Sequence, residues 1–185
     1  MTDDDKALLI AYLNSARAHV RNVLDGVPET DRRRPIVPSG WSMVGLVQHL
    51  TFDVERFWFR AVIGGEDVPL HEGMEAWQVA DEVSSAQVLE AYEHECALAD
   101  AVIQRTPLSA TAALWREEWG PLQVESLVDV IVHVLKETST HAGHLDVARE
   151  FIDGHQHLVM SLGVCRNVLR SRAGSYRVRD LVRLY

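Results

Sequence analysis

The stretch VESLVDVIVHVLKETSTHAGHLDVAREFIDG, residues 124–154, contains the longest helical pattern of the chain. Its apolar residues recur every third or fourth position, which is the spacing of one face of an α-helix. Gly154 readily ends a helix, so the pattern predicts a helix over residues 124–153. Read by threes and fours, its inward face is Leu127, Val130, Val134, Glu137, His141, His144, Ala148 and Phe151.

Glu137, His141 and His144 interrupt this otherwise apolar face. A carboxylate buried without a partner is costly or becomes protonated, so such a group normally has a cation, a donor network or a metal beside it. The interruption therefore predicts a partner for these side chains.

Three more segments of the chain show helical spacing, and each is followed by a glycine or proline that ends helices. They are residues 4–25, 41–63 and 84–105. The stretch of residues 27–40 is predicted to be a loop, and residues 66–83 a long polar connection. No segment alternates with period two, so the predicted fold is all-α, an antiparallel four-helix bundle over residues 1–154. Residues 155–185 are predicted to form a basic C-terminal extension, helical or irregular.

Composition excludes several classes of protein. The 185 residues are 47% hydrophobic, which suits one domain with a core. The net charge of −9 argues against a nucleic-acid surface. The acidic start MTDDDKALLI does not fit a signal peptide, and no apolar run is long enough for a membrane span, so a cytoplasmic protein is expected. A homodimer is compatible with the extension packing on a second subunit.

Cys96 and Cys165 are the two cysteines of the sequence. They are far apart and neither has a second cysteine nearby, which excludes a disulfide framework and a cysteine-based zinc site. Any metal must therefore be held by nitrogen and oxygen ligands.

His49, Glu137 and His141 form the candidate metal site. Glu137 and His141 are four residues apart, so they point the same way one turn apart on a helix. His49 lies on the second predicted helix, on a face shared with Leu46, Leu50, Asp53 and Phe57. Two histidines and a glutamate suit Zn²⁺ or another divalent transition metal, with a coordination position left open. Taken singly, each residue is better explained by core packing or a simple helical contact, and only their combination favours a metal as strongly as these explanations.

Two neighbours are assigned to the same site. Asp53 lies one turn after His49 and either orients its imidazole or is an exposed carboxylate. His144 lies one turn after His141, and its alternatives are a fourth ligand, a group that places substrate, or an outer hydrogen-bond donor. We assign both residues to catalysis. Trp58, Trp77, Trp115 and Trp119 are expected as apolar walls or as core.

Two segments carry a family resemblance. They are GWSMVGLVQHLTFDVERFWFRAVIGGE, residues 40–66, and HVLKETSTHAGHLDVAREFIDG, residues 133–154. Together they resemble the DinB superfamily of four-helix bundles, in the actinobacterial branch related to mycothiol-dependent maleylpyruvate isomerase and thiol transferases. In that family the histidine of a W-S-x-x-x-x-x-x-H pattern and an E/H-x-x-x-H pair bind metal. The resemblance thus implies His49, Glu137 and His141 as ligands.

The resemblance also implies a reaction. Relatives use a low-molecular-weight thiol whose sulfur attacks a small electrophile, so a metal-dependent thiol S-transferase or isomerase is the leading hypothesis. Zn²⁺ is the expected metal, with Ni²⁺, Fe²⁺ or Mn²⁺ as alternatives, and the partner is a small-molecule substrate. Two alternatives stay open: a metal-dependent hydrolase, and a non-catalytic bundle that binds metal or ligand in a stress response.

Overall fold

The computed structural model describes residues 3–121 and 124–156. Over these ranges every regular element is a helix and no strand is present, which confirms the prediction of an all-α fold. The long helices are α1 (Asp3–Val23), α4 (Ser85–Arg105) and α5 (Leu127–Asp153), and α3 (Met43–His49) continues directly into the π-helical segment η1 (Leu50–Ile63). The predictions for residues 157–185, including Cys165, lie outside the described residues.

Helix ends follow local sequence signals. The Ser84 hydroxyl accepts a hydrogen bond from the Gln87 backbone N–H, and the Gln87 side chain accepts one from the Ser84 N–H, which forms a capping box. Ser126 accepts from the Asp129 N–H, so α5 begins at Leu127, three residues later than predicted. Gly154 adopts a left-handed conformation, with φ at 74°, and ends α5 as predicted.

Some predicted loops contain short helices. Residues 27–40 were expected to be a loop, but they include α2 (Glu29–Arg33), which follows Pro28 and places acidic residues in its first turn. The two later connections contain the 3₁₀ turns η2 (Glu75–Trp77) and η3 (Glu117–Trp119).

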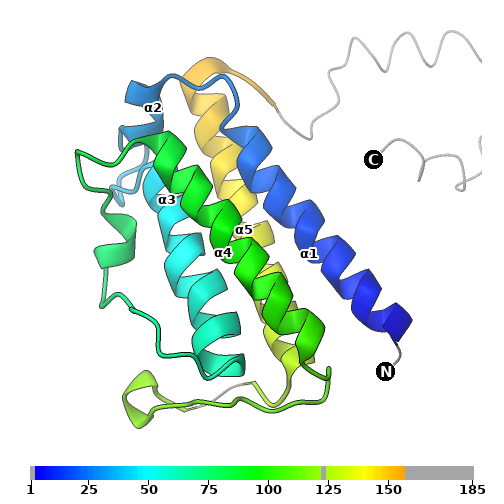
Figure 1. The fold of residues 1–185 in the computed structure, drawn as a ribbon. Helices are drawn as coiled ribbons and strands as arrows, with labels where there is room; N and C mark the ends of the chain where they lie inside the picture. The colour runs from blue at the N-terminus through cyan, green and yellow to red at the C-terminus, as the bar shows by residue number, and fades with distance from the viewer. Residues whose placement is uncertain (1–2, 122–123, 157–185) are drawn as a thin grey trace, which may run out of the picture. The chain divides into compact units, whose positions relative to one another are not determined.

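The long helices lie side by side in Figure 1, with α1 and α5 running in one direction and η1 and α4 in the other. The connection over residues 64–84 returns to the end at which α3 begins, so α4 starts beside α3. The largest packing partners are α1 with α5 and η1 with α4. The main contacts therefore join helices that run in the same direction. For η1 and α4 this is possible because the connection between them is long enough to return to the other end of the helices.

The buried face of α5 differs from the predicted one. Leu127, Val130, Val134 and Ala148 are buried as expected, but the middle of the face is formed by Thr138, Ala142 and Leu145. Glu137 and His141 are only partly buried, His144 is exposed, and Phe151 is 73% exposed. The prediction that these residues face inward was wrong for Phe151 and His144. Two neighbouring rows of residues on α5 both have a spacing of three or four. The row that is buried contains Thr138, Ala142 and Leu145, each one residue after the predicted Glu137, His141 and His144.

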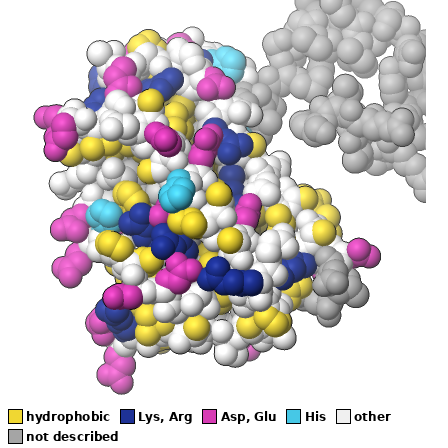
Figure 2. All heavy atoms as spheres, in the orientation of Figure 1, with side chains coloured by type: hydrophobic (Ala, Val, Ile, Leu, Met, Phe, Trp, Pro, Cys, Tyr) yellow, Lys and Arg dark blue, Asp and Glu magenta, His cyan; other side chains and the backbone are white. Residues whose placement is uncertain are grey.

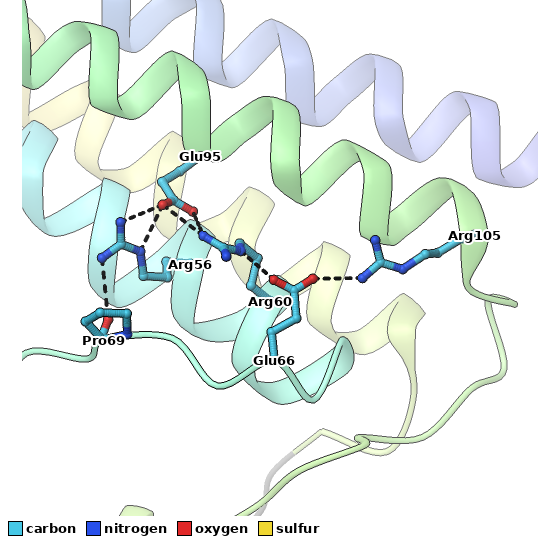
Figure 3. A network of polar contacts seen from close by, with 6 residues as sticks. All are labelled: Arg56, Arg60, Glu66, Pro69, Glu95 and Arg105. Carbon is cyan, nitrogen blue, oxygen red and sulfur yellow. Dashed lines mark hydrogen bonds and ion pairs between the residues drawn. The ribbon is translucent and has the colours of Figure 1, made fainter.

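An ionic network ties η1 to α4 and to the connection after η1 (Figure 3). The nearly buried Glu95 accepts hydrogen bonds from Arg56 at 2.6 Å and from Arg60 at 3.1 Å. Glu66 accepts from Arg60 at 2.7 Å and from Arg105 at 2.8 Å. These bonds fix the direction of η1, which carries the residues that follow His49.

The surface shown in Figure 2 mixes basic and acidic side chains, without one continuous basic area on that face. Among the described residues, no helix is long and apolar enough to cross a membrane.

Candidate functional site

His49 and Asp53 lie at the junction of α3 and η1. The Nδ1 atom of His49 is 2.8 Å from Oδ2 of Asp53, so the contact expected between them is present. If Nδ1 donates its proton to this carboxylate, the Nε2 lone pair of His49 is left for another partner. Both side chains are partly buried, which holds the imidazole in one orientation.

Glu137, His141 and His144 lie together on one side of α5. The Nε2 atom of His141 is 3.8 Å from Oε2 of Glu137, as expected for residues four apart. The Nδ1 atoms of His141 and His144 are 3.4 Å apart. Since His141 is more buried than His144, the first imidazole faces the neighbouring helix and the second faces solvent.

The two helices bring their imidazoles into contact. The ring centres of His49 and His141 are 5.2 Å apart, with the rings nearly perpendicular. One cluster thus contains His49, Glu137 and His141, although His49 lies at least 88 residues before the other two in the sequence. We call these three residues together with Asp53 and His144 the histidine cluster.

Trp77 covers the histidine cluster. Its ring is stacked on His49 with centres 4.1 Å apart, and its edge faces His141 at 5.8 Å. Trp77 comes from η2, in the middle of the connection between η1 and α4. The sequence indicated an apolar wall for this residue but gave no reason to place it against His49 in particular.

Burial favours the neutral form of His141. Loss of hydration, together with the charges of His49 and His144, lowers its pKa to about 4, although Glu137 acts in the opposite direction. A neutral imidazole carries the lone pair that a metal or a proton requires. His141 is therefore held in the protonation state of a ligand at neutral pH.

The chemical types of these side chains suit a divalent transition metal. The donor set combines two imidazoles and a carboxylate from two packed helices, one imidazole being held by an outer carboxylate, as is common in metal sites. Within residues 3–121 and 124–156, however, no group of three or more His, Cys, Asp or Glu side chains is arranged to hold a metal ion as it stands. Metal binding by His49, Glu137 and His141 stays a prediction.

Two open pockets lie near the histidine cluster, and one of them includes a member of the cluster in its lining. The larger, of about 710 Å³, includes Asp53, Phe57 and Trp119 in its lining and is mostly polar. The smaller, of about 420 Å³, is lined by Trp58, Trp115 and Trp119 and reaches Lys136, the residue before Glu137. Trp119 lines both, so it forms a wall between them.

Sequence reasoning missed two charged residues of the core. Arg17 and Glu55 are 2% and 0% exposed and are joined at 2.6 Å, so their burial is balanced by an ion pair. Glu55 does not belong to the face predicted for its helix, and the pattern of apolar residues gave no signal for it. Cys96 is also buried, and loss of hydration raises the pKa of its thiol, which argues against a reactive thiolate.

Comparison with known proteins gives one family. A family model described as Mycothiol-S-transferase matches residues 8–154. Neither the curated proteins nor the solved structures gave a match.

Proposed function

The chain belongs to the mycothiol-S-transferase family, and we propose from this premise that it transfers a low-molecular-weight thiol such as mycothiol to a small electrophile in a metal-dependent reaction. The observation that supports the proposal is the contact of His49 with His141, which joins ligand candidates from two helices beside Glu137. We also propose that α1, α3 with η1, α4 and α5 form the four-helix bundle implied by the DinB resemblance.

His49, Glu137 and His141 are the residues that would hold the metal. A divalent transition metal bound there, Zn²⁺ by preference, would lower the pKa of a thiol and so supply a nucleophilic sulfur at neutral pH. Asp53 contacts Nδ1 of His49, which would leave Nε2 available to the metal.

The transfer requires a base and an acceptor. The thiol gives up its proton, its sulfur forms a bond to an electrophilic carbon, and the bond from that carbon to its leaving group breaks, with the electron pair departing on that group. We assign the proton to His144, because its imidazole is exposed next to His141. The larger pocket adjoins the cluster at Asp53, and its polar lining suits the hydrophilic body of the thiol.

Metal content tests the ligand assignment. We expect about one equivalent of zinc per chain after reconstitution of the wild type, and less than about a tenth of that in His49→Ala and His141→Ala. His94→Ala, which removes an exposed histidine of α4, serves as the matched control and retains the metal. Absence of metal in the reconstituted wild type, or equal content in all four proteins, would overturn the assignment.

Thiol dependence tests the reaction. Zinc-loaded wild type is expected to convert 1-chloro-2,4-dinitrobenzene to its thioether with mycothiol, with release of chloride, and His141→Ala is not. Product formed equally fast without mycothiol would contradict thiol transfer and indicate water as the nucleophile, as in a hydrolase.

A further inference from the structure

Three of the five tryptophans of the sequence meet in one cleft. Trp58 comes from η1, Trp115 and Trp119 from the connection before α5, and His133 from α5 itself. We call these four residues the aromatic cleft. All four side chains are accessible to solvent to some degree, although large aromatic side chains usually gain most when they are covered.

The rings of the aromatic cleft support one another. Trp58 is stacked on Trp115 with centres 6.0 Å apart, and His133 lies at 4.5 Å from Trp58. Trp119 meets Trp115 edge to face at 5.4 Å. The Trp115 Nε1–H donates a 2.8 Å hydrogen bond to the Gly120 carbonyl, which fixes that ring. The cleft is therefore built before any ligand enters and presents both ring faces and ring edges.

The volume and the charge of the cleft limit what it can hold. Its volume of about 420 Å³ suits a small molecule rather than a polypeptide segment. Its lining has one acidic residue, Asp129, which is engaged by Ser126, and one basic residue, Lys136. The rest is aromatic or apolar apart from His133. A planar and weakly polar molecule fits this lining better than a hydrophilic one.

The lining of the cleft contains no member of the histidine cluster, but it includes Lys136, the residue that precedes Glu137. Lys136 lies at its rim, and the Lys136 Nζ atom is 3.3 Å from Oε1 of Glu137. A molecule held between the tryptophans can thus present one end to the candidate ligand Glu137 while its body stays in the cleft. The larger pocket includes Asp53 of the cluster in its lining and shares Trp119 with the cleft, so a second molecule can lie beside the first.

We propose that the aromatic cleft binds the ring of the acceptor, and that the acceptors of this protein are small aromatic electrophiles. This assignment rests on the proposed function, since it names the substrate class of the same site. Stacking and edge contacts with Trp58, Trp115 and Trp119 select aromatic over saturated rings of equal size.

Binding of matched ligands to metal-free protein tests the assignment. We expect isothermal titration calorimetry to show at least about tenfold tighter binding of 2-naphthol than of decahydro-2-naphthol, because only the former can stack. Trp115→Leu and Trp119→Leu are expected to weaken 2-naphthol binding at least about tenfold. Phe151→Leu, at an exposed aromatic residue of α5 outside the cleft, leaves it unchanged. Circular dichroism verifies that each variant keeps its helices.

Equal affinity for the two alcohols, or undiminished binding in both tryptophan variants, would overturn the assignment. A second readout uses the loaded enzyme. Trp115→Leu, at a residue that lines the cleft and not the larger pocket, should raise KM at least about fivefold for 1-chloro-2,4-dinitrobenzene but leave KM for iodoacetamide unchanged, since the latter has no ring to stack. Equal effects on both electrophiles would contradict the selection of aromatic acceptors.

These outcomes separate the two proposals. The titration involves neither metal nor thiol, so it can succeed while the metal and thiol experiments fail, which would leave an aromatic-binding site without the proposed reaction. If metal binding and thiol transfer are found but 2-naphthol does not bind in the cleft, the substrate class alone is wrong.

Discussion

Arg17 and Glu55 form a buried ion pair, which holds α1 against η1. The Arg17 guanidinium donates to both carboxylate oxygens of Glu55, at 2.8 Å and 2.6 Å, and a third bond reaches Asp100 on α4 at 2.7 Å. Burial alone would lower the pKa of Arg17, but the charge and hydrogen bonds of Glu55 outweigh it and raise the pKa. The Arg17 guanidinium is therefore held charged in the core.

Glu55→Gln is expected to lower the free energy of unfolding by about 3–5 kcal/mol, because it leaves the charge of Arg17 buried without its main partner. Urea unfolding followed by circular dichroism measures the change. Glu93→Gln provides the control, since Glu93 forms a long ion pair of 3.7 Å with Arg21 and both side chains are exposed. This substitution should lower the free energy of unfolding by less than about 1 kcal/mol. Similar losses in the two variants would show that the buried pair has no special weight.

At the scale of elements, the approach of η2 to α3 decides how Trp77 reaches His49. Gly45 lies where a Cβ atom would come within 2.4 Å of the Trp77 backbone carbonyl. The absence of a side chain at this position thus allows the connection to pack directly on the helix. Gln48 adds two bonds to the same connection, to the carbonyls of Ala76 and Gln78.

Gly45→Ala is expected to lower stability by about 1–3 kcal/mol, since the contact with a backbone atom cannot be relieved by a rotamer change. The matched substitution is Gly143→Ala on α5, where no atom lies within 4 Å of the added Cβ. There the helix propensity of alanine should raise stability by about 0.5–1 kcal/mol. Urea unfolding curves measure both, and a loss at Gly143 as large as at Gly45 would contradict the steric explanation.

The network at the end of η1 predicts a pH dependence. Burial alone would raise the pKa of Glu66, but hydrogen bonds and charges from Arg60 and Arg105 outweigh it and lower the pKa below its ordinary value of 4.5. A carboxyl group whose pKa is lower in the folded state stabilises the protein above its unfolded pKa, and this contribution is lost as pH falls through the folded pKa.

Glu66→Gln should therefore reduce stability at pH 7 and have less effect at about pH 3, where the carboxyl group of the wild type also becomes protonated. Urea midpoints measured across this range give the difference between the two proteins. Glu90→Gln, at an exposed position of α4, is the control, and its urea midpoint is expected to equal that of the wild type at every pH. A constant deficit of Glu66→Gln at all pH values would exclude the ionic explanation.

At the scale of the whole molecule, the core is independent of the proposed metal. The buried cluster draws apolar side chains from α1, α3, η1, α4 and α5, while the histidine cluster lies at its edge. The fold should therefore persist without metal, in contrast to small zinc domains that unfold when the metal is removed.

Chelator-treated protein is expected to keep its helical circular dichroism. Zinc at about a hundredfold excess over its Kd should add about 2.7 kcal/mol and raise Tm by about 5–10 °C. The rise should be absent in His141→Ala and present in His94→Ala. Loss of helicity on chelation would contradict a core that is complete without metal, and an equal rise in His141→Ala would locate the zinc elsewhere.

The sequence alone determined the features that depend on neighbours along the chain. Helical spacing, Ser84 with its capping box and Gly154 at the end of α5 set the positions of the long helices to within a few residues. The contacts of His49 with Asp53 and of Glu137 with His141 were predictable for the same reason, because residues four apart on a helix are adjacent wherever the helix packs.

Features that depend on neighbours in space came only from the packing of the helices. A spacing of three or four could not tell whether Glu137 or Thr138 faces the core, since the two stripes differ by one residue and the packing of α5 against α1 and η1 selects between them. Trp77 reaches His49 only because a connection far along the chain folds back on α3. The Arg17 and Glu55 charges are tolerated in the core only because α1 and η1 place them together, and no local pattern encodes a partner 38 residues away.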